Sequence, residues 1–210
     1  VCSGVRWRAG QVVVHCSGAS TVQSLESARA QGAQVGSIHP CQSFAGVEQA
    51  IANLPGSTFG IEAEEPVRGI LTEMARALKG DIVYLTSEDK VLYHAAAAIA
   101  CNYFVTIEKL ATDLWKNFGK SSADGIKAYM PLLRGTLANI ETTGFPKCLT
   151  GPIARGDVAT IGRHLKALER CAPELVPLYK QLGRFTVPIG QDKGSLAADK
   201  AAELRTLLDE

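Results

Sequence analysis

Four of five residues spaced by four along the most apolar stretch of the sequence are polar. The row consists of Lys90, His94, Ala98, Asn102 and Thr106. Residues spaced by four lie along one ridge of an α-helix. Buried polar groups need partners, which are either other side chains or a ligand. An amine or imidazole whose pKa is lowered by burial can transfer a proton near neutral pH, and an amide can orient a substrate.

The helix that carries this row is predicted to run from Thr86 to Gly119. Thr86, with Asp89 three residues later, forms a capping-box pattern, and Gly119 suits the residue that follows a helix. Such a helix has roughly 30 residues and is about 45 Å long. Its first half is apolar nearly all round, which predicts burial on most sides, and its alanines allow neighbouring helices to approach closely.

The composition is that of a globular protein. Hydrophobic residues make up 46% and charged residues 20% of the 210 positions, and the net charge of +1 gives no attraction to nucleic acid or to an anionic membrane. The run 91–107 is shorter and more polar than a membrane span. Six cysteines are scattered without a CxxC pair, so we expect reduced thiols in a cytoplasmic protein: Cys2, Cys16, Cys41, Cys101, Cys148 and Cys171.

Strand-like and helix-like segments alternate up to residue 86. Short apolar runs bounded by turn residues predict strands at 11–15, 34–39, 57–63 and 81–85. Helices are expected between them at 21–31, 47–53 and 66–79, the last with Pro66 at its start and Gly80 past its end. This alternation predicts βαβ units and a largely parallel sheet.

From residue 87 onward the pattern is helical and contains no good strand. After the long helix we expect a helix within 122–144, its main part starting at Pro131, and another from an Asp157 cap to Arg170. Further helices are expected from Pro173 to 182 and, after a loop at 185–194 and a Ser195 cap, from 196 to 208. The two predicted domains are therefore residues 1–86 and 87–210.

Two loops with polar residues follow neighbouring predicted strands. Ser17-Gly18 follows the first strand and His39-Pro40 ends the second, so both lie at the carboxyl edge of the predicted sheet. Open α/β sheets bind ligands at that edge. The alternative is a pair of ordinary turns in which backbone groups satisfy the histidines.

Two other patterns have simpler explanations than a binding site. His15, Cys16, His39 and Cys41 offer nitrogen and sulfur ligands that suit zinc, but His15 and Cys16 point to opposite faces if the strand continues through them. We therefore predict no metal site. In Arg155-Gly-Asp157, the aspartate is explained as a helix cap, and the arginine is either solvated or in contact with an anion.

Several motifs occur in one order along the chain. They are His15-Cys-Ser-Gly-Ala19, His39-Pro40, Lys90-x-x-Tyr-His-Ala-Ala-Ala97, Asn102, and Leu149-Thr-Gly-Pro152 followed by Arg155-Gly-Asp157. Together they resemble an uncharacterised family of Rossmann-like oxidoreductases, in which an NAD(P)-type domain precedes a helical domain of unknown function. That family belongs to the 6-phosphogluconate dehydrogenase-like superfamily, with ketopantoate reductase and pyrroline-carboxylate reductase as better-known relatives. The resemblance covers roughly residues 10–182.

The resemblance implies a fold of α/β followed by all-α. The first part would be the C-terminal half of a Rossmann-like parallel sheet, and the second a helical domain of the 6-phosphogluconate dehydrogenase C-terminal type. The implied cofactor of the intact parent protein is NADP or NAD. By similarity to pyrroline-carboxylate reductases, the cofactor-binding candidates near the nicotinamide are Ser17, Gly18, His39 and Pro40.

The resemblance also assigns roles to the polar row. Related dehydrogenases place a lysine and an asparagine on the first helix after the sheet, which makes Lys90, His94 and Asn102 the candidate catalytic residues. They would face a cleft beside the helical part and bind a small carbonyl, hydroxy or imine substrate. Relatives pair through the helical domain, so a homodimer is implied, with no nucleic-acid or membrane partner.

One departure from the family pattern leaves two function classes open. No G-x-G-x-x-G occurs in the 210 residues, and that motif brings backbone amides and a helix N-terminus to the cofactor's pyrophosphate. The first class is an NAD(P)-dependent oxidoreductase or part of one, favoured by the polar row and the His39-Pro40 loop. The second is a non-catalytic dimeric binding or assembly module, favoured by the missing glycine loop.

We expect the coding sequence to extend upstream of Val1 by about 100 residues or more. The added segment should contain a GxGxxG loop after a strand, because a mononucleotide-binding half is a β-α-β-α-β unit. The gene sequence together with an intact-mass measurement checks this. A native start codon at or next to Val1 would contradict the expectation and favour the non-catalytic class.

Overall fold

The protein, seen in a computed structural model that describes residues 4–209, forms two compact units that divide between Thr106 and Ile107. The first unit holds a β-sheet and its helices. The described residues after Tyr84 contain no strand, as predicted, and the change from strand to helix falls between Tyr84 and Ser87.

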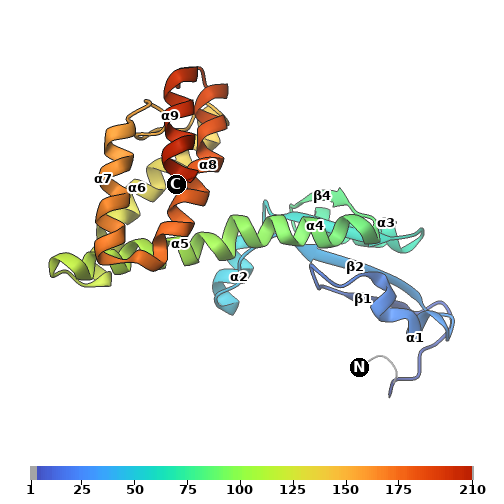
Figure 1. The fold of residues 1–210 in the computed structure, drawn as a ribbon. Coiled ribbons are helices and arrows are strands. Elements are labelled where there is room, and N and C mark those ends of the chain that lie inside the picture. The colour runs from blue at the N-terminus through green and yellow to red at the C-terminus, as the bar shows by residue number, and fades with distance from the viewer. Residues whose placement is uncertain (1–3, 210) are drawn as a thin grey trace. The chain divides into compact units, whose positions relative to one another are not determined.

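Four strands form one sheet in the order β1-β2-β3-β4 (Figure 1). They are β1 Val12–His15, β2 Gln34–Pro40, β3 Thr58–Ala63 and β4 Asp81–Tyr84, each close to its predicted bounds. The pairs β1/β2 and β3/β4 are parallel, as expected, whereas the central pair β2/β3 is antiparallel. The helix between β2 and β3, α2 (Val47–Asn53), buries no side chain, so it does not cover the sheet as the crossover helix of a parallel pair does.

Helices cover both faces of this sheet. On one face, Ile38, Phe59 and Ile61 pack against α3 (Val67–Ala77). On the other, Val13 and Val35 pack against the 3-10 helix η2 (Val22–Leu25) and α1 (Glu26–Arg29). Because side chains alternate between the faces of a strand, Ser37 and His39 also point to this second face.

A buried ion pair joins the long helix to that second face. Lys90 is 0% exposed, and its ammonium donates a hydrogen bond to Ser37 Oγ and lies 3.4 Å from Glu62 Oε2. Glu62, the register partner of Ser37, also accepts hydrogen bonds from the Val22 amide (3.1 Å) and from the Ser87 hydroxyl. Each charge is therefore paired and hydrogen-bonded, which is the condition under which a buried ion pair is tolerated.

The predicted long helix has both of its predicted ends. Thr86 and Asp89 form a capping box, and Gly119 takes a left-handed conformation with φ of 76°. Four segments follow one another between them: α4 Ser87–Ala97, the π-helix η3 Ala98–Tyr103, α5 Phe104–Asp113 and the 3-10 helix η4 Leu114–Phe118. The π-helical segment is a feature that the spacing of the polar row did not predict.

The prediction that this helix is buried on most sides is wrong for the chain. Lys90 is the buried residue of α4, whereas Val91, Leu92 and Val105 are exposed to 63%, 75% and 64%. Apolar composition indicates that a surface needs a cover, but it does not tell whether the same chain supplies that cover.

By length and composition alone, the helix Ser87–Phe118 is long and apolar enough to cross a membrane. It has 32 residues and a mean hydropathy of 1.2 over an 18-residue window, none of which is buried inside the chain. The sequence-based prediction of no membrane span rested on the shorter run at 91–107. A single helix of this kind does not distinguish a membrane span from a helix that another protein surface covers.

The second unit consists of helices around one apolar core. Its elements after η4 are α6 Ser122–Thr143, α7 Val158–Cys171, the 3-10 helix η5 Pro173–Leu175, α8 Val176–Asp192 and α9 Ala198–Asp209. Ile161 and Leu165 of α7, Val187 of α8 and Leu204 of α9 meet in the core. Asp157 caps α7 as predicted, because its side chain accepts a hydrogen bond from the Thr160 amide at 3.0 Å.

Three details of this unit differ from the sequence prediction. Pro131 lies inside α6, because a Ser121–Asp124 capping box starts that helix one residue after Ser121. The predicted loop at 185–194 is largely helical, since α8 continues to Asp192 and buries Val187 completely. Ser195 does not cap the last helix, because its hydroxyl donates to the carbonyl of Ala154 at 2.8 Å.

Replacing Lys90 with methionine should lower the free energy of unfolding by about 3–5 kcal/mol, because Glu62 would stay buried without its counter-charge. Urea unfolding followed by circular dichroism measures this. The matched control is Lys109→Met, which removes an exposed pair with Asp113 and should cost less than about 1 kcal/mol. Equal losses in the two variants would show that the buried pair does not hold α4.

Candidate functional site

A hollow of about 490 Å³ lies at the end of β2 within the first compact unit. One wall is the chain that follows β2, from His39 through Cys41 to Phe44. The other wall is formed by α4 and η3, which contribute His94, Ala98 and Asn102 from the polar row. Three of the predicted site residues, His39, His94 and Asn102, therefore line one hollow.

The Ser17-Gly18 loop approaches the two histidines from the end of β1. A Cβ atom on Gly18 would lie 2.4 Å from Cδ2 of His94 and 2.8 Å from Nε2 of His39. Any side chain at position 18 would displace both rings, so glycine is the residue that fits. Ser17 turns back on its own loop, where its hydroxyl donates to Ser20 Oγ and accepts from the Ser20 amide, both at 3.0 Å.

Tyr93, which the sequence analysis did not select, holds His39 in place. Its hydroxyl lies 3.0 Å from His39 Nδ1, and the two rings meet edge-on with centroids 5.6 Å apart. The ring packs over Gly60, the register partner of His39, where a Cβ atom would lie 3.1 Å from it. Burial and the neighbouring Cys41 raise the pKa of Tyr93, which keeps the hydroxyl protonated. Tyr93 is part of the Lys90-x-x-Tyr-His motif, and this was the sequence feature that could have identified it.

His39 and His94 face each other across the hollow's end with ring centroids 6.0 Å apart. Burial lowers the pKa of His39 below its usual value of 6.5, and positive charge on His94 and Lys90 lowers it further. Both effects favour the neutral imidazole. A neutral imidazole offers one donor and one acceptor, and Tyr93 occupies one of these two positions.

The other predicted site residues do not line this hollow. The Lys90 ammonium belongs to the cluster with Ser37 and Glu62; burial lowers its pKa, and the Glu62 carboxylate partly offsets that effect. Pro40 ends β2 opposite Phe59. Lys90 lies one helical turn before His94 on α4, so the buried pair and the hollow are adjacent along the helix.

The π-helical segment widens the wall that the long helix presents. Ala97, Ala98, Ala100, Cys101 and Asn102 all line the hollow, a nearly continuous run that a strict spacing of four does not present to one side. π-helical turns interrupt α-helices rarely and are frequent at functional sites. The spacing argument identified Ala98 and Asn102 and missed the other three.

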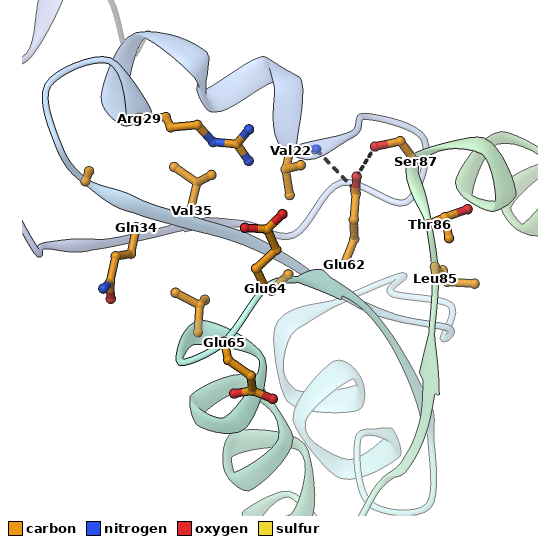
Figure 2. A pocket seen from close by; sticks show the side chains of 13 residues that line it. Val22, Arg29, Gln34, Val35, Glu62, Glu64, Glu65, Leu85, Thr86 and Ser87 are labelled. Carbon is orange, nitrogen blue, oxygen red and sulfur yellow. Dashed lines mark hydrogen bonds between the residues drawn. The ribbon is translucent and has the colours of Figure 1, made fainter.

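A second hollow, also of about 490 Å³, lies where β3 and β4 end (Figure 2). Figure 2 shows Arg29 and Glu64 extending toward it, with Glu62 bonded to the Val22 amide and the Ser87 hydroxyl. The two hollows lie apart because β2 and β3 run antiparallel. The carboxyl ends of β1 and β2 therefore lie at one end of the sheet, and those of β3 and β4 lie at the other. None of the predicted site residues lines this second hollow.

Within residues 4–209, no group of three or more His, Cys, Asp or Glu side chains is placed to hold a metal ion. Backbone groups satisfy His15, whose Nε2 lies 3.1 Å from the Thr21 carbonyl and whose Nδ1 accepts from the Ser17 amide. The five cysteines in this range are free thiols, and Cys2 lies outside the described residues.

This architecture is a Rossmann-like partial sheet followed by a helical domain. A family model described as "Domain of unknown function (DUF2520)" matches residues 57–186, which is more than half of the chain, and the chain belongs to this family. No curated protein sequence matches the chain significantly.

Solved structures share the fold. The protein TM1727 of Thermotoga maritima is 28% identical with a TM-score of 0.74, and the match covers 87% of this chain and 70% of that one. The "putative NADP oxidoreductase BF3122" of Bacteroides fragilis is 24% identical with a TM-score of 0.68, over 84% of this chain and 65% of that one. A reductive aminase of Aspergillus terreus is 17% identical with a TM-score of 0.46, over 96% and 64%. The first two likenesses confirm the predicted fold class.

The stability of the protein should fall on acidification below pH 6.5, and His39 should account for part of the loss. Because the pKa of His39 is lowered in the folded state, the unfolded chain binds more protons between that pKa and 6.5, so stability rises with pH across this window. Urea unfolding at pH values from 5 to 7.5 should show a shallower pH dependence in His39→Gln. Burial also lowers the pKa of His15, so the free energy of unfolding of His39→Gln should still rise with pH, but less steeply. If the free energy of unfolding of His39→Gln depended on pH as steeply as that of the unmodified chain, the assignment of the loss to His39 would be wrong.

Proposed function

We propose that this chain forms the substrate side of an NAD(P)-dependent oxidoreductase that reduces or oxidises a small carbonyl, hydroxy or imine compound. The observation that carries the proposal is the hollow at the end of β2, where two imidazoles and an amide converge on small alanine side chains. The likeness in fold to a protein named as an NADP oxidoreductase supports it.

The side chains of the hollow suit the reacting end of a cofactor and a substrate, and they do not suit phosphates. No lysine or arginine lines the hollow, so nothing there neutralises a diphosphate, and the glycine-rich loop that would hold one is absent from the sequence. When bound, NADP or NAD supplies hydride transfer. The loops at Ser17-Gly18 and His39-Pro40 are proposed to border the nicotinamide.

Each residue of the hollow has a proposed role that follows from its surroundings. His94 gives or takes the proton at the substrate oxygen or nitrogen, since its ring nitrogens form no hydrogen bond with another residue of the described chain. His39, neutral and held by Tyr93, hydrogen-bonds the same substrate atom. Asn102, exposed on the wall of the hollow, orients the substrate. Lys90, a catalytic candidate from the sequence, is proposed to position His94 from within its buried pair.

In an enzyme that contains this chain, His94→Gln should lower kcat by about 10²-fold or more, because the proton donor is lost. Asn102→Ala should mainly raise KM, because it removes an orienting contact. NADPH oxidation with a panel of small ketones, 2-oxo acids and cyclic imines measures both parameters. Lys109→Met, on an exposed part of α5, is the control and should change neither. Full activity of His94→Gln and Asn102→Ala would overturn the catalytic assignment.

A second candidate function, a non-catalytic dimeric binding or assembly module, is favoured by the open apolar faces of the long helix. Val91, Leu92, Ile99 and Val105 are each more than half exposed on it. A second copy of the chain offers the same surface, and a two-fold axis lets the two patches cover each other. We propose a homodimer that buries this helix, compatible with either function.

Light scattering at micromolar concentration should give about twice the 22.3 kDa mass of one chain. Leu92→Glu with Val105→Glu should shift the protein toward the monomer, because two charges would enter the buried interface. Arg76→Glu, at an exposed position of α3, is the matched surface control. A clean monomer for the unmodified chain would contradict the dimer, and partition into detergent micelles would point instead to a membrane.

A further inference from the structure

A third hollow, of about 330 Å³, lies in the second compact unit and shares no lining residue with the other two. Its apolar walls include Pro152, Ile153 and Leu182, and its polar side chains include Thr150, His164 and Tyr179. Thr150 and Pro152 come from the Leu149-Thr-Gly-Pro152 motif, which the proposed oxidoreductase function does not use. A volume near 300 Å³ is at the small end of the range for ligand pockets.

A histidine–tyrosine pair places a hydrogen-bond donor at this hollow. The Tyr179 hydroxyl lies 2.8 Å from His164 Nδ1, and the rings meet edge-on at an interplanar angle of 84°. Burial raises the pKa of Tyr179, which favours its protonated hydroxyl. When this hydroxyl donates to Nδ1, a neutral His164 ring carries its hydrogen on Nε2, and in that tautomer Nε2 is a hydrogen-bond donor.

The wall formed by the motif is held in place by the protein itself. Lys193 Nζ donates to the Leu149 carbonyl at 2.6 Å, and the Arg155 and Asp157 amides both donate to the Pro152 carbonyl, at 3.2 and 2.9 Å. The Ser195 hydroxyl fixes the Ala154 carbonyl at 2.8 Å. Because this wall is ordered before a ligand binds, ordering it does not weaken binding.

The lining of the hollow carries no negatively charged side chain. None of its nine lining residues, all within the described chain, is aspartate or glutamate. The Lys193 ammonium donates to the carbonyl of Leu149, the residue before Thr150. An anionic group placed against His164 would therefore meet no repelling carboxylate of the lining, and the imidazole can donate a charge-assisted hydrogen bond to it.

We propose that this hollow is a binding site for a small monocarboxylate with a compact apolar body. The carboxylate accepts a hydrogen bond from Nε2 of His164, and the apolar body packs against Pro152, Ile153 and Leu182. The site is separate from the proposed oxidoreductase hollow and does not depend on that function.

Benzoate is a suitable probe, with benzamide as its neutral match. In an NMR titration of the full chain, benzoate should bind saturably and shift the His164 and Tyr179 signals. Tyr179→Phe keeps the ring packing and frees His164 Nδ1, and His164→Gln removes the imidazole. Each should weaken benzoate binding by about tenfold or more, because a hydrogen bond to a charged group is lost or misaligned.

The His94→Gln variant, whose altered side chain belongs to the hollow at β2, should bind benzoate as the unmodified chain does. Circular dichroism confirms that each variant is folded. Unchanged affinity in folded His164→Gln and Tyr179→Phe, or no saturable benzoate binding at all, would overturn the site. Equal affinity for benzamide would overturn its assignment to a carboxylate.

Discussion

The ion pair between Lys90 and Glu62 fixes where the long helix lies on the sheet. An apolar helix face can slide or rotate at modest cost, because one methyl group replaces another at the contact. A buried ammonium cannot, because a shift away from Glu62 and Ser37 would leave a charge without a partner in a dry interior. Most apolar side chains of α4 are exposed in this chain, so apolar packing contributes little to its position. The polar cluster therefore sets the register of α4 on the sheet.

The chemistry of the hollow at β2 follows from that register. One turn after Lys90, Tyr93 packs over Gly60 and bonds His39, and His94 comes against the loop at Gly18. Strand alternation brings Ser37, His39 and Glu62 to one face of the sheet, so the structural pair and the candidate catalytic histidine share a surface. The π-helical segment then turns Cys101 and Asn102 into the same wall. The buried pair and the residues proposed for catalysis are thus adjacent on one helix.

The chain combines a site suited to small polar groups with an extensive apolar surface. The hollow at β2 has hydrogen-bond donors, acceptors and thiols, and no lysine or arginine among the described residues that line it. The open faces of the long helix fit assembly, and an oxidoreductase that dimerises through this helix would use both features. The family match and the fold likeness to TM1727 are consistent with the α/β-then-helical order that the motifs implied.

The sequence by itself determined most of the elements and several of their ends. Strand positions, the Thr86 capping box, the Gly119 stop and the Asp157 cap follow from local backbone and hydrogen-bond chemistry, which a few neighbouring residues decide. It also brought His39, His94 and Asn102 forward as site residues, through strand ends and a spacing of four. Only the tertiary structure decided that Lys90 pairs with Glu62, that β2 and β3 run antiparallel, and that Tyr93 holds His39. Those partners are 28 to 54 residues apart or depend on strand direction, and nothing local encodes which distant group satisfies a buried charge. A charged residue in the apolar strand β3 was the signal for Glu62, but its counter-charge could be identified only once the chain had folded.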